Sequence, residues 1–169
     1  ASLRAKRLSV TRTAADVEVS DYRQTLELGL EGLRVGVPDT YFFDDLNPQY
    51  AAAVQAAIAS LRELGAEVKP VSLPASAYAS SASWVISYSE SFVFHEAWFR
   101  ERAHDYTPAF YHKVVAAGLT SAVERIVSQR IRQQVTREFI EALREVDVIV
   151  TPGSRTLASE KGAGDMTSL

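Results

Sequence analysis

The 169-residue sequence contains no cysteine. This excludes disulfide bonds, thiolate metal sites and a cysteine nucleophile, and it fits a reducing compartment, so we expect a cytoplasmic location. No apolar run approaches the roughly 20 residues that a membrane-spanning helix needs, and no segment has the charged head and apolar core of a signal peptide. We therefore expect a soluble protein without membrane contact.

The sequence also lacks a strong charge bias, since 18 basic and 21 acidic residues are scattered along the chain and give a net charge of −3. The densest basic stretch is Arg4, Lys6 and Arg7, which gives little electrostatic support for nucleic-acid binding. The histidines at positions 95, 104 and 112 match no metal-binding spacing. Asp44 and Asp45 are adjacent carboxylates, which we interpret as a solvated turn. The sequence therefore predicts no metal site.

A β-α-β pattern occupies the stretch from Leu28 to Pro74. Alternating apolar residues after Gly32 predict a strand that ends at Pro38. Asn47 is a good helix N-cap and Pro48 suits the first helical position, and apolar residues then recur at helical spacing until Gly65. The segment 66–74 predicts a second strand. Two strands joined by one helix are expected to pair in parallel, through a right-handed crossover.

The second half of the chain is predicted to be mostly helical. Residues 75–104 indicate one long helix or two shorter ones, and residues 107–118 indicate a short helix. Thr120 or Ser121 is predicted to cap a long amphipathic helix, which the third strand, VDVIVTP, follows. The expected core positions are Tyr78, Trp84, Val85, Tyr88, Phe92 and Phe99, together with the stripe Val123, Ile126, Val127, Ile131, Val135, Phe139 and Leu143.

These elements predict an α/β fold of about three strands, partly parallel, packed with amphipathic helices. Residues 1–20 are expected to form an extended arm or the remnant of an upstream segment. Residues 21–152 are expected to form the α/β domain and residues 153–169 a loop or tail.

Four stretches, in order, carry a resemblance to a known family. They are LEGLRVGVPDTYFF, AEVKPVSLP, SYSESFVFHEAWFRERAHDYTP and SQRIRQQVTREFIEALREVDVIVTP, between Leu30 and Pro152. Together they resemble the carboxy-terminal half of the amidase-signature hydrolases. The stretch TRTAAD resembles a segment that lies further upstream in the family, so the sequence is expected to be abridged between Asp16 and Ser20.

The resemblance implies hydrolysis of amide, carbamate or ester bonds through an acyl-serine, with no cofactor. The family uses a serine nucleophile, a second serine and a lysine, because a neutral hydroxyl needs a base to become a nucleophile. Those groups belong to the amino-terminal half of the family. This sequence has only four lysines, none in a matching context, and no Gly-Gly-Ser-Ser-Gly stretch, so we assign no catalytic residue within it.

Three residues are candidates for substrate binding. Tyr41 and Phe42 follow the carboxyl end of the first strand, where open α/β sheets bind ligands, although aromatic packing is the simpler interpretation. The resemblance assigns Arg132 to a position where a guanidinium would contact a substrate carboxylate, and an ion pair with a glutamate is the alternative. Glu90 is expected to be a buried acceptor that holds a loop.

The resemblance also extends to a subunit of a transfer-RNA-dependent amidotransferase, which the acidic charge balance disfavours because it offers no surface for RNA. Two other functions remain open. The chain is either part of an amidase that acts on a small amide substrate, or a non-catalytic module for small-molecule binding or oligomerisation. The partner would be the remainder of the amidase or a second copy of the chain, and nucleic acid is not expected. Exposed aromatic residues would supply the interface of the module, and the candidates are Trp84, Trp98, Tyr106 and Phe110.

Overall fold

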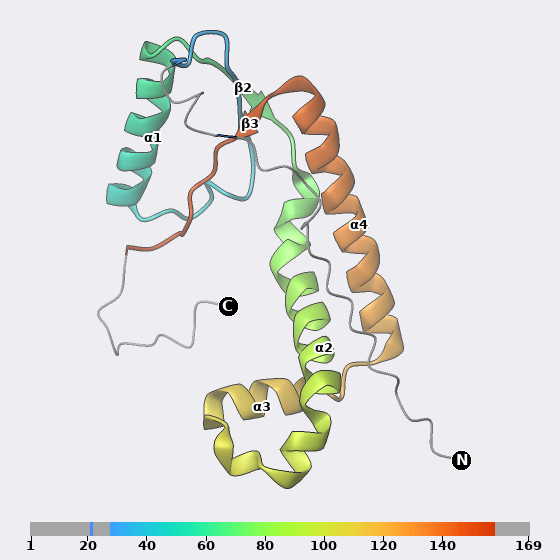
Figure 1. Cartoon of the computed structure of the whole chain (residues 1–169). Helices are drawn as coiled ribbons and strands as arrows, with labels where there is room; N and C mark the ends of the chain where they lie inside the picture. The colour runs from blue at the N-terminus through green and yellow to red at the C-terminus, as the bar shows by residue number, and fades with distance from the viewer. Residues whose placement is uncertain (1–20, 22–27, 158–169) are drawn as a thin grey trace.

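The computed structural model describes residue 21 and residues 28–157. A small sheet with one helix beside it forms one end of the molecule, and a long helical arm leads away from it (Figure 1). In chain order the elements are β1 (Arg34–Pro38), α1 (Pro48–Glu63), β2 (Glu67–Val71), the 3₁₀ turn η2 (Pro74–Tyr78), α2 (Ala79–Glu101), the 3₁₀ turn η3 (Ala103–Asp105), α3 (Pro108–Ala117), α4 (Ala122–Glu145) and β3 (Val148–Ile149).

The three strands form a sheet in the order β2-β1-β3, and both pairs are parallel. Val35 pairs with Val68 on one side and with Val148 on the other. The predicted α/β class is therefore confirmed. The third strand is shorter than expected, with two residues only, and Val148 within it is 39% exposed.

Local signals set the boundaries of α1 as the sequence predicts. The side-chain oxygen of Asn47 accepts hydrogen bonds from the backbone N–H groups of Gln49 and Tyr50. Gly65 follows the helix with a φ of 94°, a conformation that residues with a Cβ rarely adopt. The helix thus starts and stops through contacts within a few residues of its own ends.

The core of the sheet end lies where α4 returns to the strands. Val71, Leu73 and Val146 form a buried cluster, and partly buried apolar side chains pack around it. Gly36, at the centre of β1, allows this close approach, because an added Cβ would lie 2.8 Å from Val71 and 3.0 Å from Val146. The residues that pack around the cluster are Phe42, Phe139, Ala142 and Ile149.

The helical arm consists of α2 and α4 side by side, with α3 at the end far from the sheet (Figure 1). Residues 79–101 form one helix, which decides between the two alternatives that the sequence left open. Ser121 caps α4 in a reciprocal capping box with Glu124. None of the helices in the described ranges combines the length and the apolarity that a membrane crossing requires.

Several predicted core positions are wrong. Tyr78 is 62% exposed, and half or more of Val123 and Ile126 is exposed. The buried residue of α4 is instead Ser128, because α4 packs against α2 and η2 with a face that leaves Val123 and Ile126 outside. Among the expected core positions of α2, Phe99 is buried, and the half-buried ones are Trp84, Val85, Tyr88 and Phe92.

Some expectations concern residues outside the described ranges. They are the extended arm at residues 1–20, the abridgement between Asp16 and Ser20, and the end of the tail from residue 158.

Candidate functional site

Two loops meet at the carboxyl edge of the sheet. One follows β1 and contains Tyr41, and the other follows β3 and contains Arg155. The backbone N–H of Asn47 donates to the carbonyl of Arg155 at 2.9 Å, and the N–H of Gly153 donates to the hydroxyl of Tyr50 at 3.1 Å. The first bond joins the two loops and the second ties the later loop to α1, at the edge where parallel sheets commonly bind ligands.

Tyr41 is fixed in an unusual conformation within this pair of loops. Its φ is 61°, in the left-handed region, and its N–H donates to the carboxylate of Asp44 at 3.0 Å. The Arg155 guanidinium lies 4.8 Å from the centre of the Tyr41 ring and donates to the Tyr41 carbonyl at 3.1 Å. The cation therefore holds both the ring and the backbone of Tyr41.

Phe42 packs against the core, which was the simpler of the two interpretations that the sequence allowed for this residue. Its side chain packs against the buried cluster of Val71, Leu73 and Val146, and its ring meets the Tyr41 ring edge-on at a centroid distance of 5.2 Å. Phe42 thus anchors the loop in the core. The neighbouring Tyr41 ring instead contacts the Arg155 guanidinium.

Arg132 lies elsewhere, in a cleft of about 390 Å³ between α2 and α4. Within the described part of the chain its guanidinium has no ion-pair partner, so the predicted alternative of a glutamate pair is not found there. The hydroxyl groups of Ser83, Ser87 and Thr136 line the same cleft. Glu90 lines the cleft as well, with its carboxylate paired to Arg125, and the Thr136 hydroxyl donates to the Arg132 carbonyl at 2.8 Å. The Arg132 guanidinium is the group in this cleft that suits a small anion. The lining of this cleft includes neither Tyr41 nor Phe42.

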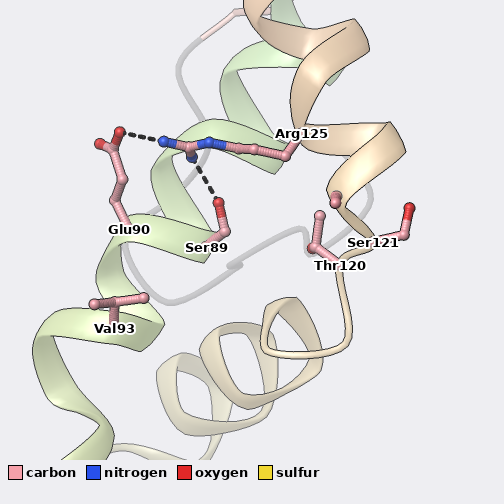
Figure 2. Close-up of a pocket in the computed structure, with 7 residues that line it drawn as sticks. Ser89, Glu90, Val93, Thr120, Ser121 and Arg125 are labelled. Atoms are coloured by element: carbon pink, nitrogen blue, oxygen red, sulfur yellow. Dashed lines mark hydrogen bonds and ion pairs between the residues drawn. The ribbon is translucent and has the colours of Figure 1, made fainter.

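The ion pair expected of Arg132 is made by Arg125 instead. Its guanidinium donates to Glu90 at 2.7 Å, to the Ser89 hydroxyl at 2.7 Å and to the Ile86 carbonyl at 2.8 Å. Figure 2 shows the side chain reaching from α4 across to α2. Glu90 is therefore not a buried acceptor that holds a loop. Its side chain is 61% exposed and helps to tie two helices together.

The histidines have no catalytic arrangement. The His95 ring nitrogen Nδ1 shares a hydrogen bond of 3.0 Å with the hydroxyl of Tyr106, and the ring stacks on Phe99. His104 and His112 are exposed. Among the residues that the structure describes, no group of three or more histidine, aspartate or glutamate side chains is placed to hold a metal ion.

Arg125 and Arg155 were not identified from the sequence. Arg125 stands in a helix with several other arginines, and no local feature sets it apart. Arg155 lies in a segment whose composition indicated only a loop. Both act on residues 35 or more positions away, and a single sequence carries no signal of such pairs.

Comparison with known proteins identifies the family. The family model described as "Amidase" matches residues 4–168. A glutamyl-tRNA(Gln) amidotransferase subunit from Acidobacterium capsulatum is 33% identical over 174 residues, and an amidase from Pseudomonas putida is 33% identical over 147 residues. These matches cover 89% and 87% of this chain, but only 37% and 32% of the two relatives.

Solved structures agree with this result. A structure from a vestigial protein complex, described as revealing the origins of an s-triazine catabolic enzyme, superimposes with a TM-score of 0.75 at 26% identity. The superposition covers 86% of this chain and 31% of that one. A bacterial aryl acylamidase shares the fold, with a TM-score of 0.65 at 17% identity over 84% of this chain and 33% of its own. The chain spans about a third of the length of its relatives, and it belongs to the amidase family.

Proposed function

We propose that this chain is the carboxy-terminal part of an amidase-signature hydrolase that cleaves amide, carbamate or ester bonds through an acyl-serine. The match of the family model over residues 4–168 is the observation that carries the proposal. The coverage of only about a third of each relative supports a division of labour, in which the nucleophile and its base lie outside this chain.

The chemistry explains why this chain would not act alone. Attack on an amide needs a hydroxyl activated by a base, and the oxyanion that forms needs N–H donors. In this proposal two serines and a lysine in the remaining part of the hydrolase supply these groups. The carboxy-terminal part supplies a wall of the substrate pocket and three strands of the central sheet, without metal or cofactor.

The proposed wall has two parts. Tyr41, held by Arg155 and anchored through Phe42, presents a ring at the carboxyl edge of the sheet. Arg132 presents a cation in the α2–α4 cleft, where a carboxylate on the substrate would find a charge and the serine residues Ser83 and Ser87. The carboxylate of Glu90 lines the same cleft and is paired with Arg125. The net charge of −3 supports a small amide substrate rather than nucleic acid. The proposal includes a cytoplasmic location, which the cysteine-free composition supports.

A non-catalytic module for small-molecule binding or oligomerisation is the second candidate. The exposed rings of Trp98 and Phe110 favour it, because both lie against His95 in a single aromatic cluster. Exposed aromatic side chains of this kind are frequent in interfaces.

The test joins an intact-mass measurement to an activity assay. The natural gene product that carries this chain is purified, weighed by mass spectrometry and assayed for hydrolysis of a chromogenic anilide, with and without a serine-directed inhibitor. A mass close to three times 18.6 kDa, with hydrolysis that the inhibitor abolishes, supports the amidase. A mass of 18.6 kDa without hydrolysis supports the module.

The role of Arg132 is tested on the same protein. Arg132→Gln is expected to raise KM for anilides that carry a carboxylate and to leave uncharged anilides unaffected, because only the former lose an ion pair. Arg130→Gln, two positions earlier on α4 and also exposed, is the matched control. Equal changes with both classes of substrate would remove Arg132 from the pocket.

A further inference from the structure

Both non-glycine residues with a positive φ in the described part of the chain lie in the loop after β1. Tyr41 has a φ of 61° and Asp45 has a φ of 54°. A side chain makes this left-handed conformation costly, and residues held in it cluster at active sites and ligand-binding loops. The backbone strain of the described chain is therefore concentrated in the loop at residues 39–47, at the carboxyl edge of the sheet.

Two hydrogen bonds hold the backbone of Tyr41 in this conformation. Its N–H donates to the carboxylate of Asp44, which belongs to the same loop, at 3.0 Å. Its carbonyl accepts from the guanidinium of Arg155, which belongs to the loop after β3, at 3.1 Å. Arg155 thus fixes the strained residue from outside its own loop.

The ring of Tyr41 is fixed as well, but its hydroxyl is free. The Arg155 guanidinium lies over the ring, 4.8 Å from its centroid, and the Phe42 ring meets it edge-on. Tyr41 is half-buried, and among the residues that the structure describes its hydroxyl has no hydrogen-bond partner. A ring that is held in place and keeps a free hydroxyl is suited to contact a bound molecule.

The Arg155 side chain binds Tyr41 rather than a carboxylate. Within the described ranges Arg155 forms no ion pair, and both contacts of its guanidinium go to the ring and the carbonyl of Tyr41. Its own carbonyl accepts the N–H of Asn47, which fixes its backbone against the loop that contains Tyr41. These contacts give Arg155 the geometry of a support for the Tyr41 ring.

We propose that Arg155 is a positioning residue, which holds the Tyr41 ring in place for the aryl group of an aryl amide substrate. This inference rests on the proposed function, because it needs the amide substrate of the complete hydrolase. An aryl amide suits the site because aromatic rings pair edge-on or offset, and because its carbonyl oxygen can accept the free Tyr41 hydroxyl. Arg155 acts through Tyr41 and does not touch the substrate.

The first test is a double-mutant cycle on KM and kcat of the natural gene product, with para-nitroacetanilide as the substrate. Arg155→Ala is expected to raise KM about two- to fivefold, the range that an exposed cation–π contact allows, and to leave kcat unchanged. In a Tyr41→Ala background the same substitution is expected to change neither constant. Arg155→Lys keeps the charge and should restore part of the loss. Arg62→Ala, at an exposed arginine near the end of α1, is the matched control.

Three kinetic results would overturn the proposal. A rise in KM that persists in the Tyr41→Ala background would mean that Arg155 contacts the substrate itself. A lower kcat with an unchanged KM would mean that Arg155→Ala only reduces the amount of folded protein. An equal rise in KM for hexanamide, which has no ring, would remove the aryl group from the contact with Tyr41.

A second measurement does not depend on hydrolysis. The substitution Tyr41→fluorotyrosine gives a fluorine resonance, which is followed by NMR while para-nitroacetanilide is added. We expect the resonance to shift, and Arg155→Ala to require about two- to fivefold more anilide for half of the shift. Equal anilide requirements in the two proteins would refute the role of Arg155.

Anilide hydrolysis by the unmodified protein separates the two proposals. A shift without hydrolysis would refute the proposed function and keep the contact at Tyr41. Hydrolysis without a shift would do the reverse, and the absence of both would refute both proposals.

Discussion

Asp147 accepts three hydrogen bonds from Arg34, a residue 113 positions earlier in the chain. The Arg34 backbone N–H and Nε donate to Oδ2 at 2.9 and 3.1 Å, and Nη2 donates to Oδ1 at 2.6 Å. The N–H of Asp147 donates in return to the Arg34 carbonyl at 2.8 Å. This bidentate contact fixes β3 beside β1, where only two residues of β3 pair directly.

Because of the Arg34 contact, part of the folding stability depends on pH. Hydrogen bonds from Arg34 lower the pKa of Asp147 from 3.8 to about 2. A carboxyl group whose pKa is lower in the folded state stabilises the fold above its unfolded pKa, and this contribution is lost as the pH falls through the folded pKa. We therefore expect Asp147→Asn to lower the melting temperature at pH 7 and to have little effect at pH 2.

The measurement is a series of thermal melts of both proteins between pH 7 and pH 2. Asp105→Asn serves as the control, because Asp105 pairs with Arg102 three residues away and joins no two strands. A difference between wild type and Asp147→Asn that stays constant across the whole pH range would contradict the linkage.

Arg125 is expected to matter more for the helical arm than its ion-pair partner does. Arg125→Met removes three hydrogen bonds between α4 and α2 and leaves the Ile86 carbonyl and Ser89 hydroxyl with one partner fewer, so we expect a loss of about 1–3 kcal/mol. Glu90→Gln removes one exposed charge and is expected to cost less than about 1 kcal/mol. Urea denaturation measures the free energy of unfolding of both variants. An equal or greater loss of stability for Glu90→Gln would contradict the larger role given to Arg125.

A side chain at position 36 is expected to destabilise the fold. In Gly36→Ala the new Cβ would lie 2.8 Å from Val71 Cγ1 and 3.0 Å from Val146 Cγ2, a clash that typically costs about 1–3 kcal/mol. Gly153→Ala is the control, since the nearest atom to its Cβ is 3.8 Å away. If the clash is the cause, adding Val71→Ala should make the Gly36→Ala step less costly, as a denaturation series on the four proteins would show.

The sequence predicted what depends on neighbouring residues. Asn47 caps α1, Gly65 ends it, and Ser121, one of two candidates, caps α4, because each of these contacts spans four residues or fewer. The order of strands and helices followed from the same local patterns. The parallel pairing of β1 and β2 followed from a general rule of connection rather than from any particular residue.

The predictions that failed concern contacts between residues that are far apart in the sequence. The apolar spacing in α4 predicted an amphipathic helix but not which face α2 would cover, so Val123 and Ile126 were expected in the core and are exposed. The pairs Arg34–Asp147 and Arg155–Tyr41 are more than 110 residues apart in sequence. Many arginines and carboxylates in the chain could form such pairs, and only the folded backbone selects among them.

The last prediction concerns Arg155 and the ring of Tyr41. If the contact is a cation–π interaction, its strength depends on the aromatic ring and not on the tyrosine hydroxyl. Arg155→Ala is therefore expected to lower the free energy of unfolding by about 0.5–1 kcal/mol more in a Tyr41→Phe background than in a Tyr41→Leu background. A double-mutant cycle gives this coupling directly, because the Arg155 hydrogen bond to the Tyr41 carbonyl is present in both backgrounds and cancels. Equal losses with phenylalanine and leucine would show that the hydrogen bond alone holds the loop. A larger loss with phenylalanine would establish that the cation also positions the ring, and hydrogen exchange of the loop at residues 39–47 should then be faster in Arg155→Ala.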